Sequence, residues 1–344
     1  MRPTLQRKRS TGRVTLSDVA RVAGVSPITV SRALRGERSV DPVLVERVTQ
    51  ASTQLGYVPD PAARALASQR SNHVAVLIPL LSNALFVDLL DAAQRTLRAG
   101  GFQTLIGVTH YDQAQEEQLL SEQLLHRPAG LLLTGLDQNA ATRALVAKSQ
   151  VPCVHLMDLP SPTDANPPYC VGFRQTDAGA ALTRLLLARG RRCIAFAGAQ
   201  LDPRVMQRRD GWRLTLQAQG LYDPGLEWLN PAASSLALGG AMFETILQQN
   251  PNVDAIFFCN DDLAQGALLA ALRLAIPVPD RVAIAGFNDL TGSDQMLPTL
   301  TTVRTPRANI GEAAATMLMA LMRGESKTQP LIDLGFHIVE RDSA

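Results

Sequence analysis

From Asn72 onward, short apolar runs of strand length alternate with segments of helical periodicity. The apolar runs span 74–80, 102–108, 130–134, 153–158, 170–173, 193–198, 255–260 and 282–287. The helical segments between them include 85–98, 113–125, 176–189, 206–219, 238–249 and 263–274. Repeated strand–helix units form parallel sheets, and continuous apolar strands indicate burial on both faces. These strands are too many for one sheet in a region of this size, so we expect an α/β body of two doubly wound parallel-sheet subdomains.

The segment 14–36 lacks this alternation and instead carries the start and stop signals of two short helices. Thr15, with Asp18 three residues later, is a capping-box start, and Gly24 ends the first helix in a tight turn. Ser26 is an N-cap residue, and Pro27 occupies the first position of a second helix, where its missing N–H costs nothing. Two short helices joined by a glycine-containing turn form a helix-turn-helix.

The second helix divides into a core-facing side and an outward side. Val30, Ala33 and Leu34 can face the domain core, as Val19, Ala20, Val22 and Ala23 can in the first helix. The side chains that project outward are Ile28, Thr29, Ser31 and Arg32. Such an outer face in a basic segment fits the major groove of DNA. The same two helices also occur as plain hairpins, so the pattern alone leaves DNA binding and a structural role open.

Positive charge is concentrated at the N-terminus. Residues 1–70 carry 12 Lys and Arg against 5 Asp and Glu, a net charge of +7, whereas the remaining residues carry 21 against 26, a net charge of −5. A basic module on a mildly acidic body favours contact with phosphate groups. The arm 1–13 is basic and has no apolar core of signal-peptide length, and no later run approaches transmembrane length. We therefore expect a cytoplasmic protein with no membrane partner.

A third helix and a short linker follow. Asp41 and Pro42 repeat the cap-then-proline start, and Gly56 ends the helix, which completes an all-α headpiece over 14–59. The segment 60–71 holds one further helical run, too short to be stable alone, in which Leu66 is a lone large apolar residue among alanines. This run is either an interdomain linker or a helix that orders on DNA and inserts Leu66 into the minor groove.

Polar residues follow most of the strand-like runs of the body. Ligands of open parallel sheets bind at the carboxyl ends of the strands. A hydroxyl-rich small molecule needs many hydrogen-bond partners there, together with an aromatic face. The candidate ligand-binding residues are Ser82, Asn83, Phe86, Tyr111, Thr134, Asp158, Arg174, Asn260 and Asn288. Each of them is equally explained as an exposed loop end or a helix cap.

The remaining chemistry-bearing residues form no catalytic or metal-binding pattern. Cys153, Cys170, Cys193 and Cys259 occur singly in apolar runs, which indicates buried free thiols. We find no glycine-rich phosphate loop, no G-x-S-x-G elbow and no histidine or cysteine spacing typical of a metal site. We therefore expect neither an enzyme nor a cofactor. A periplasmic sugar-binding protein would need a signal peptide and would have no use for the headpiece.

The segment 15–32 matches the pattern T-L-x-D-V-A-x-x-A-G-V-S-x-x-T-V-S-R, and it resembles the headpiece of the LacI/GalR family of bacterial repressors. Similar segments follow at 257–268, 278–290 and 298–314, so the resemblance covers nearly the whole chain. It implies a periplasmic-binding-protein-like body and a sequence-specific transcriptional repressor. Such a repressor binds a palindromic operator as a homodimer and responds to a small-molecule effector.

The resemblance also implies DNA-contacting positions. They are Thr15, Leu16, Ser26, Pro27, Ile28, Thr29, Ser31, Arg32, Arg35, Arg64 and Leu66. Leu66 stands where the family has its hinge leucine, which favours the minor-groove role. Pro27 and Ile28 replace the polar pair with which the lactose repressor reads bases, so that repressor's half-site does not carry over.

The same resemblance places Arg208, ten residues beyond Gly198, among the effector-binding residues. Arg208 with Arg174 can bind a carboxylate, which favours a sugar acid over a neutral sugar. The segments 77–86, 156–158, 171–173 and 331–336 are similar to the gluconate-utilisation repressors of the family. We therefore expect gluconate as an inducer, with 2-ketogluconate, a neutral sugar and co-repression as open alternatives. Asn288 departs from the Asp of many relatives.

The expected body has two interleaved subdomains. The first spans about 72–173 and 303–330, and the second spans about 174–302 and 331–344. No leucine heptad of the kind that makes tetramers follows the last strand-like run, so a dimer is expected. The helical segments 85–98 and 310–322 are the surfaces that we expect at the dimer interface.

Overall fold

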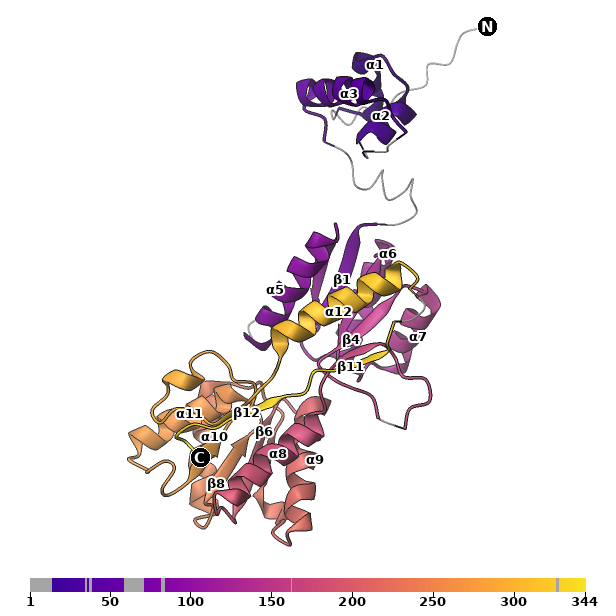
Figure 1. Cartoon of the computed structure of the whole chain (residues 1–344). Helices are drawn as coiled ribbons and strands as arrows, with labels where there is room; N and C mark the ends of the chain where they lie inside the picture. Colours follow the sequence, from indigo (N-terminus) through magenta and orange to yellow (C-terminus); the bar gives the residue numbers. More distant parts are fainter. Residues whose placement is uncertain are drawn as a thin grey trace. The chain divides into compact units, whose positions relative to one another are not determined.

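The computed structural model describes residues 14–34, 36, 39–58, 71–81, 84–161, 163–325 and 328–344. The chain divides into two compact units, Met1–Ser71 and Asn72–Ala344 (Figure 1). The expected basic arm 1–13 and hinge segment, with Arg35, Arg64, Leu66, Ser82 and Asn83, lie outside the described residues.

The N-terminal unit contains a three-helix headpiece, as the sequence predicts. Its helices are α1 (Leu16–Ala23), α2 (Pro27–Leu34) and α3 (Pro42–Leu55). The buried side chains that hold them together are Val19, Ala20, Ala23, Val30, Ala33, Val48 and Ala51. The prediction that Val22 and Leu34 face the core is wrong, because Val22 is 49% exposed and Leu34 is 36% exposed. Helices of only two turns bury a narrow face, and these two residues lie at its edge.

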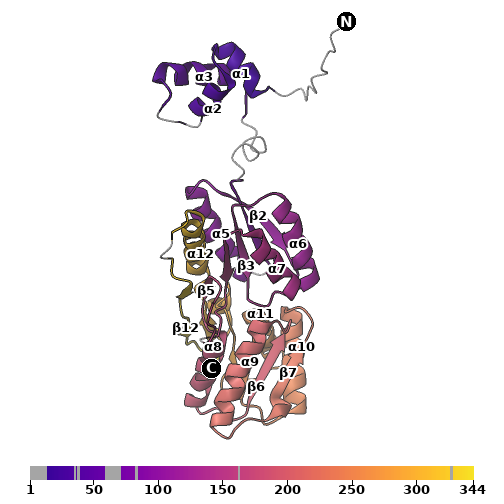
Figure 2. The same ribbon diagram turned by 90° about the vertical axis from the view of Figure 1, so that its right-hand side faces the viewer.

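The body contains a first, six-stranded parallel sheet in the order β11-β5-β4-β3-β1-β2. Its strands are β1 (His73–Ile78), β2 (Gln103–Val108), β3 (Gly130–Thr134), β4 (Cys153–Leu156), β5 (Cys170–Gly172) and β11 (Leu331–Asp333). Its helices are α5 (Ala84–Ala99), α6 (Gln113–Leu125), α7 (Ala140–Ser149) and α12 (Arg307–Met322). Helices α5 and α12 pack side by side on one face, and α6 and α7 cover the other (Figure 2). We call this part the first subdomain.

A second, four-stranded parallel sheet has the order β7-β6-β8-β9 and defines the second subdomain. Its strands are β6 (Ile194–Ala199), β7 (Glu227–Asn230), β8 (Ala255–Phe258) and β9 (Ala283–Ala285). Its helices are α8 (Gln175–Ala188), α9 (Pro203–Ala218), α10 (Leu236–Gln249) and α11 (Asp261–Arg273). Short 3-10 helices, η1 (Pro224–Leu226) and η2 (Ser293–Gln295), lie in its loops. The expectation of two doubly wound parallel sheets is confirmed.

The chain crosses between the subdomains three times. It passes from β5 to α8, from β10 (Thr302–Arg304) to α12, and from β11 to β12 (His337–Val339). Strands β10 and β12 pair antiparallel. Assigning 331–344 wholly to the second subdomain is wrong, because β11 pairs with β5 in the first sheet. Gly335, with φ +63°, breaks the strand-like run into two strands that serve different sheets.

Helices α5 and α12, which we expected at a dimer interface, pack against each other through their apolar faces. The dimer interface stays a prediction, because this packing does not exclude a partner on the outer sides of the two helices. Gly311 of α12 lies so close that a Cβ there would be 2.2 Å from the Leu89 carbonyl oxygen of α5. The amphipathic pattern therefore belongs to the core of the first subdomain. Strand β7 and helix α7 had no apolar run to predict them, since the residues of β7 are mostly half-buried and those of α7 are mostly exposed.

Helices α10 and α11 also meet through glycine, and this contact gives a stability prediction. A Cβ on Gly239 would lie 2.0 Å from the Leu263 carbonyl oxygen, whereas a Cβ on the adjacent Gly240 would come no closer than 3.3 Å to another atom. We expect Gly239→Ala to lower the free energy of unfolding by roughly 1–3 kcal/mol through overpacking. Gly240→Ala is the matched control and should be neutral or stabilising, because alanine favours helix over glycine. Equal denaturant midpoints for the two variants would contradict this packing.

Candidate DNA-binding helix and effector site

Helix α2 presents an outward face of the expected composition. Val30 and Ala33 are buried, Ile28 is 65% exposed, and Pro27 and Arg32 are exposed. Thr29 and Ser31 are half-buried. The face that a partner would meet is therefore centred on Ile28 and Arg32.

The other predicted headpiece residues fix the starts of the helices. The Thr15 hydroxyl donates to the Asp18 carboxylate at 2.7 Å, and Thr15 N–H donates to the same oxygen at 3.0 Å. Ser26 Oγ accepts from Thr29 N–H at 3.1 Å and lies 2.9 Å from the Thr29 hydroxyl. Leu16 packs against the headpiece core. These contacts orient α1 and α2, and contact of the same residues with DNA stays a prediction.

In the body, Arg208 of α9 lies at the centre of a polar cluster between the carboxyl ends of the two sheets. Its Nε donates to Gln175 Oε1 at 2.8 Å, and its Nη1 donates to the Cys259 carbonyl at 2.7 Å and to Asn260 Oδ1 at 3.1 Å. Its guanidinium carbon lies 3.9 Å from the centre of the Phe287 ring, a cation–π contact. The side chain is therefore fixed by loops that follow β5, β8 and β9.

The positive charge of Arg208 feels the carboxylate of Asp202, but the two groups form no ion pair. Arg208 is 2% exposed, its hydrogen-bond acceptors are neutral, and within the described ranges it forms no ion pair. Burial accordingly lowers the pKa of Arg208. A buried cation held by neutral partners favours the binding of an anion.

Asn260 and Asn288 complete this cluster. Asn288 Nδ2 donates to Asn260 Oδ1 at 3.2 Å. The same Asn260 oxygen also accepts from Arg208, so it connects the two side chains. Asn288 is fully buried, yet its Oδ1 has no hydrogen-bond partner. Its φ of 109° is strained for a residue with a side chain. An unpartnered buried acceptor and a strained backbone are both typical of a ligand-binding position.

A second polar cluster joins the two subdomains. Gln207 of α9 donates to Asp158 Oδ2 at 3.2 Å, and the Arg204 guanidinium lies over the Tyr111 ring at 5.9 Å. Burial raises the pKa of Tyr111 to about 12, so its phenol stays protonated and can donate. Burial also raises the pKa of Asp158. The structure thus brings together Tyr111, Asp158, Arg208, Asn260 and Asn288 around α9.

Three predicted residues lie elsewhere or are already engaged. The Thr134 hydroxyl donates to the Leu77 carbonyl at 3.0 Å. Phe86 is buried in the apolar core of the body. Arg174 donates to the Pro160 carbonyl at 3.4 Å and shares no hydrogen-bond partner with Arg208. No feature of the structure therefore supports a joint Arg174–Arg208 carboxylate clamp.

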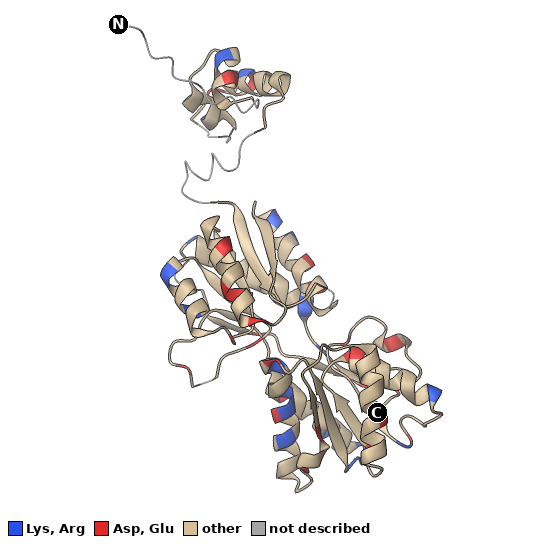
Figure 3. Cartoon of the chain, turned by 180° about the vertical axis from the view of Figure 1, so that it is seen from behind, with Lys and Arg blue, Asp and Glu red and all other residues tan. Residues whose placement is uncertain are grey.

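Sequence reasoning did not nominate three residues of this region: Arg204, Gln207 and Phe287. Helix α9 carries four arginines and a single aspartate, and a run of arginines is usually a solvated face. Figure 3 shows Lys, Arg, Asp and Glu spread over the helices of the body. Arg204 is nevertheless buried and Gln207 half-buried. Arg204 lies one helical turn before Arg208, and Gln207 directly precedes it. The i, i+4 spacing of Arg204 and Arg208 was the available signal, since it places both on one side of a helix.

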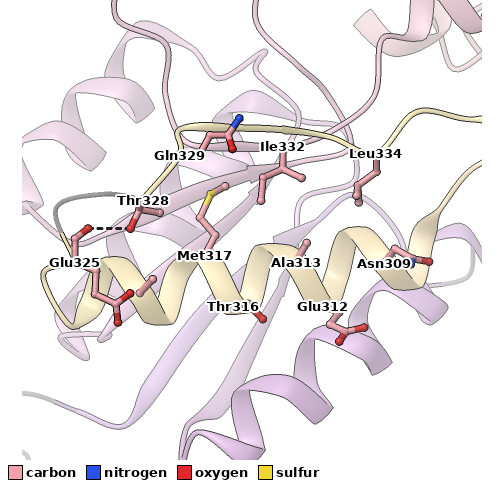
Figure 4. Close-up of a pocket in the computed structure, with 11 residues that line it drawn as sticks. Asn309, Glu312, Ala313, Thr316, Met317, Glu325, Thr328, Gln329, Ile332 and Leu334 are labelled. Atoms are coloured by element: carbon pink, nitrogen blue, oxygen red, sulfur yellow. Dashed lines mark hydrogen bonds between the residues drawn. The ribbon is translucent and has the colours of Figure 1, made fainter.

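A separate groove lies beside α12, with a volume of about 600 Å³. Figure 4 shows its lining, in which Ala313 and Met317 of α12 face Ile332 and Leu334 of the neighbouring strand and the turn after it. None of the residues around Arg208 lines this groove. It is therefore distinct from the predicted effector site.

Asp261, at the start of α11, holds the loop that carries Asn288. Its carboxylate accepts from the Thr302 hydroxyl at 2.6 Å, from Leu290 N–H at 2.6 Å and from the Ser293 hydroxyl at 3.0 Å. Burial raises its pKa to about 6 in spite of these hydrogen bonds. The side chain therefore connects α11, β10 and the loop after β9.

This raised pKa predicts a pH-dependent stability. The folded state holds a proton on Asp261 that the unfolded chain loses near pH 4, so folding stability falls as the pH rises from about 4 to about 6. The Asp261 contribution is roughly 3 kcal/mol across that window. We expect the stability advantage of wild type over Asp261→Asn to shrink over this range, as measured by urea unfolding at each pH. A constant advantage would show that Asp261 does not titrate there.

The other site expectations concern cysteines, metals and membranes. Cys153, Cys170, Cys193 and Cys259 are free thiols, and Cys170 and Cys259 are buried. Among the described residues, no three His, Cys, Asp or Glu side chains are grouped as a metal site would need. No helix in the same residues is long and apolar enough to span a bilayer.

Comparison with known proteins finds a matching protein family for each of the two units. Residues 15–60 match bacterial regulatory proteins of the lacI family, and residues 183–344 match the periplasmic binding protein-like domain. The HTH-type transcriptional regulator GntR of Pseudomonas aeruginosa is 52% identical, over 97% of this chain and 97% of that protein. The regulator of the same name in Escherichia coli is 35% identical, over 94% and 96%. The crystal structure of transcription regulator GntR from Chromobacterium violaceum is 48% identical, covers 79% of this chain and 98% of that chain, and superposes with a TM-score of 0.76.

The helix-turn-helix headpiece and the two-sheet body thus define a DNA-binding transcriptional regulator with an effector-binding domain. The chain belongs to the LacI family of bacterial regulatory proteins.

Proposed function

We propose that this regulator is a repressor that leaves a palindromic operator when it binds a sugar acid such as gluconate. The observation that carries the proposal is the buried charge of Arg208, whose hydrogen-bond acceptors are all neutral and which forms no ion pair among the described residues. The carboxylate of a sugar acid would supply the missing negative charge. We propose no catalytic role, and we propose a cytoplasmic location because operator DNA would be found there.

The neighbours of Arg208 support an anionic ligand over a neutral sugar. Asn260 and Asn288 are amides, and a carboxylate at position 288 would repel the carboxylate of a sugar acid. The Asn288 departure from many relatives therefore agrees with an acidic effector. The hydroxyl groups of the ligand would meet Tyr111 and Asp158, which offer a phenolic donor and a carboxyl group.

The contacts between the subdomains support a mechanism of release. Gln207 and Asp158 already connect α9 to the loop after β4 at 3.2 Å. A ligand that binds both sides favours one arrangement of the subdomains, and in the proposed mechanism that arrangement holds the two 60–71 segments of the dimer in positions that disfavour DNA. The coupling equals the differential affinity of the ligand for the two arrangements, typically ~1–3 kcal/mol per site. Co-repression has the opposite sign of coupling.

The proposed binding to a palindromic operator implies a homodimer. One helix-turn-helix reads a half-site, so a two-fold dimer matches a palindrome. Footprinting on DNA upstream of the regulator's own gene should show two symmetric protected half-sites separated by about one helical turn. Protection of a single half-site by a monomer would contradict the proposal.

Leu66 provides a further test of operator binding. We expect Leu66→Ala to weaken operator affinity at fixed salt, because the proposed wedge between base pairs is lost, and to leave gluconate affinity unchanged. Leu66→Met is the matched control and should keep most of the affinity, because it retains a long apolar side chain. Gel-shift titration measures both. If Leu66→Ala binds the operator as tightly as wild type does, the segment 60–71 is better explained as an interdomain linker.

A further inference from the structure

Arg204 is the second buried arginine of α9, and part of its head group has no partner. The residue is 5% exposed. Its Nε pairs with Asp202 Oδ1 at 3.1 Å, and its guanidinium lies over Tyr111. Its Nη1 is buried and forms no hydrogen bond within the described structure. A buried N–H of a cation without an acceptor is costly, so this atom favours an oxygen ligand.

The unpartnered Nη1 points at a backbone position that has no side chain. Gly135 follows β3 in the first subdomain, and a Cβ there would lie 2.6 Å from Arg204 Nη1 and 2.4 Å from Asp137 Oδ1. Gly135 is held in place, because its N–H donates to the Leu156 carbonyl at 2.9 Å and its carbonyl accepts from His155 Nδ1 at 2.9 Å. The glycine thus lets a cation from one subdomain and a carboxylate from the other approach the same point.

Arg204 Nη1 and Asp137 Oδ1 are near each other without forming an ion pair. Their distances to that point put them at most about 5 Å apart, and polar atoms farther apart than about 3.5 Å are commonly bridged by an oxygen atom. They form no contact within the 4.0 Å of a salt bridge. An atom that bridged the two groups would have to accept from the guanidinium and donate to the carboxylate. A hydroxyl group does both, whereas a ligand carboxylate cannot donate and would be repelled by Asp137.

We propose that Gly135, Asp137 and Arg204 form a subsite for one hydroxyl group of the effector, separate from the carboxylate position at Arg208. The inference rests on the proposed function, since it assigns the polyhydroxyl part of the same ligand. Because Asp137 belongs to the first subdomain and Arg204 to the second, a hydroxyl group bound here connects the two. The subsite therefore selects polyhydroxylated ligands and contributes to the change in subdomain arrangement.

The test measures the affinity of full-length protein for two probes by isothermal titration calorimetry. Gluconate carries a carboxylate and a chain of hydroxyl groups, and sorbitol carries the hydroxyl groups without the carboxylate. The variants are Asp137→Ala and Arg204→Lys, which remove the acceptor and shorten the donor. The matched control is Asp164→Ala, which removes an exposed carboxylate from a surface loop of the same subdomain. Thermal unfolding of each variant reports whether it is folded.

Both site variants are expected to lose about tenfold in affinity for both probes, and the control is expected to match wild type. Wild-type affinities for folded Asp137→Ala would overturn the subsite and leave the carboxylate proposal standing. Equal wild-type affinities for gluconate and sorbitol, both reduced in the variants, would overturn the sugar-acid proposal and support the subsite. Failure of wild type to bind either probe would overturn both.

Discussion

Arg208→Met is expected to abolish the response to gluconate while operator binding persists. Methionine keeps the apolar length of the side chain beside Phe287 but removes the buried cation and all its hydrogen bonds. The lost charge-assisted contacts should reduce gluconate affinity by at least about 100-fold, or about 3 kcal/mol. Calorimetry measures the affinity, and a gel shift with and without gluconate measures the response.

Two further variants make this result decisive. Arg208→Lys keeps the charge and should retain part of the affinity, which separates loss of charge from loss of packing. Arg213→Gln removes a neighbouring arginine of α9 whose ion pair is with Asp210 at 3.0 Å, and it should behave as wild type. A normal gluconate response in Arg208→Met would refute the carboxylate position.

Arg32→Gln is expected to have the largest single effect on DNA binding. Arg32 is exposed on the outward face of α2, beyond the buried Val30 and Ala33. Loss of an arginine that contacts a base edge costs about 1–3 kcal/mol, which is roughly 5- to 150-fold in operator affinity. Binding to unrelated DNA should change much less, so the specificity ratio should fall. Fluorescence anisotropy at fixed salt measures both affinities.

Arg21→Gln is the charge-matched control for that measurement. Arg21 is exposed at the end of α1 and pairs with Asp18, so it has no place on the outward face of α2. Its loss should weaken operator and unrelated DNA alike, as removal of a general phosphate attraction does. An equal loss of specificity in both variants would contradict the assignment of α2 as the reading helix.

The headpiece could be predicted from sequence because its signals are local. Thr15 with Asp18, and Asp41 with Pro42, each define a helix start within a few residues, and the structure has these caps. The alternation of apolar strands and helices likewise predicts two parallel sheets. The alternation could not predict with which sheets the segment after α12 would pair. Leu331 and His337 look like parts of one strand, and the tertiary pairing of each half decides its sheet.

The candidate effector site shows a similar division. Asn260 and Asn288 were predictable because they directly follow strands, where the ends of a parallel sheet meet. Arg204 was missed in spite of its i, i+4 spacing from Arg208, because its burial depends on Tyr111 and Gly135, which are far away in sequence. A ligand-binding role of Arg174 stays a prediction, and only the structure shows that its head group donates to the Pro160 carbonyl at 3.4 Å. Charge patterning along a helix does not say which charges face inward.

The proposed release of DNA by a sugar acid can be measured by fluorescence anisotropy of the full-length protein on operator DNA, titrated with gluconate, 2-ketogluconate and glucose at fixed salt. We expect gluconate to release the DNA and glucose to leave it bound, because of these two only gluconate carries a carboxylate that can neutralise Arg208. Release by glucose with the same midpoint as gluconate, or operator binding that none of the three ligands changes, would contradict this proposal.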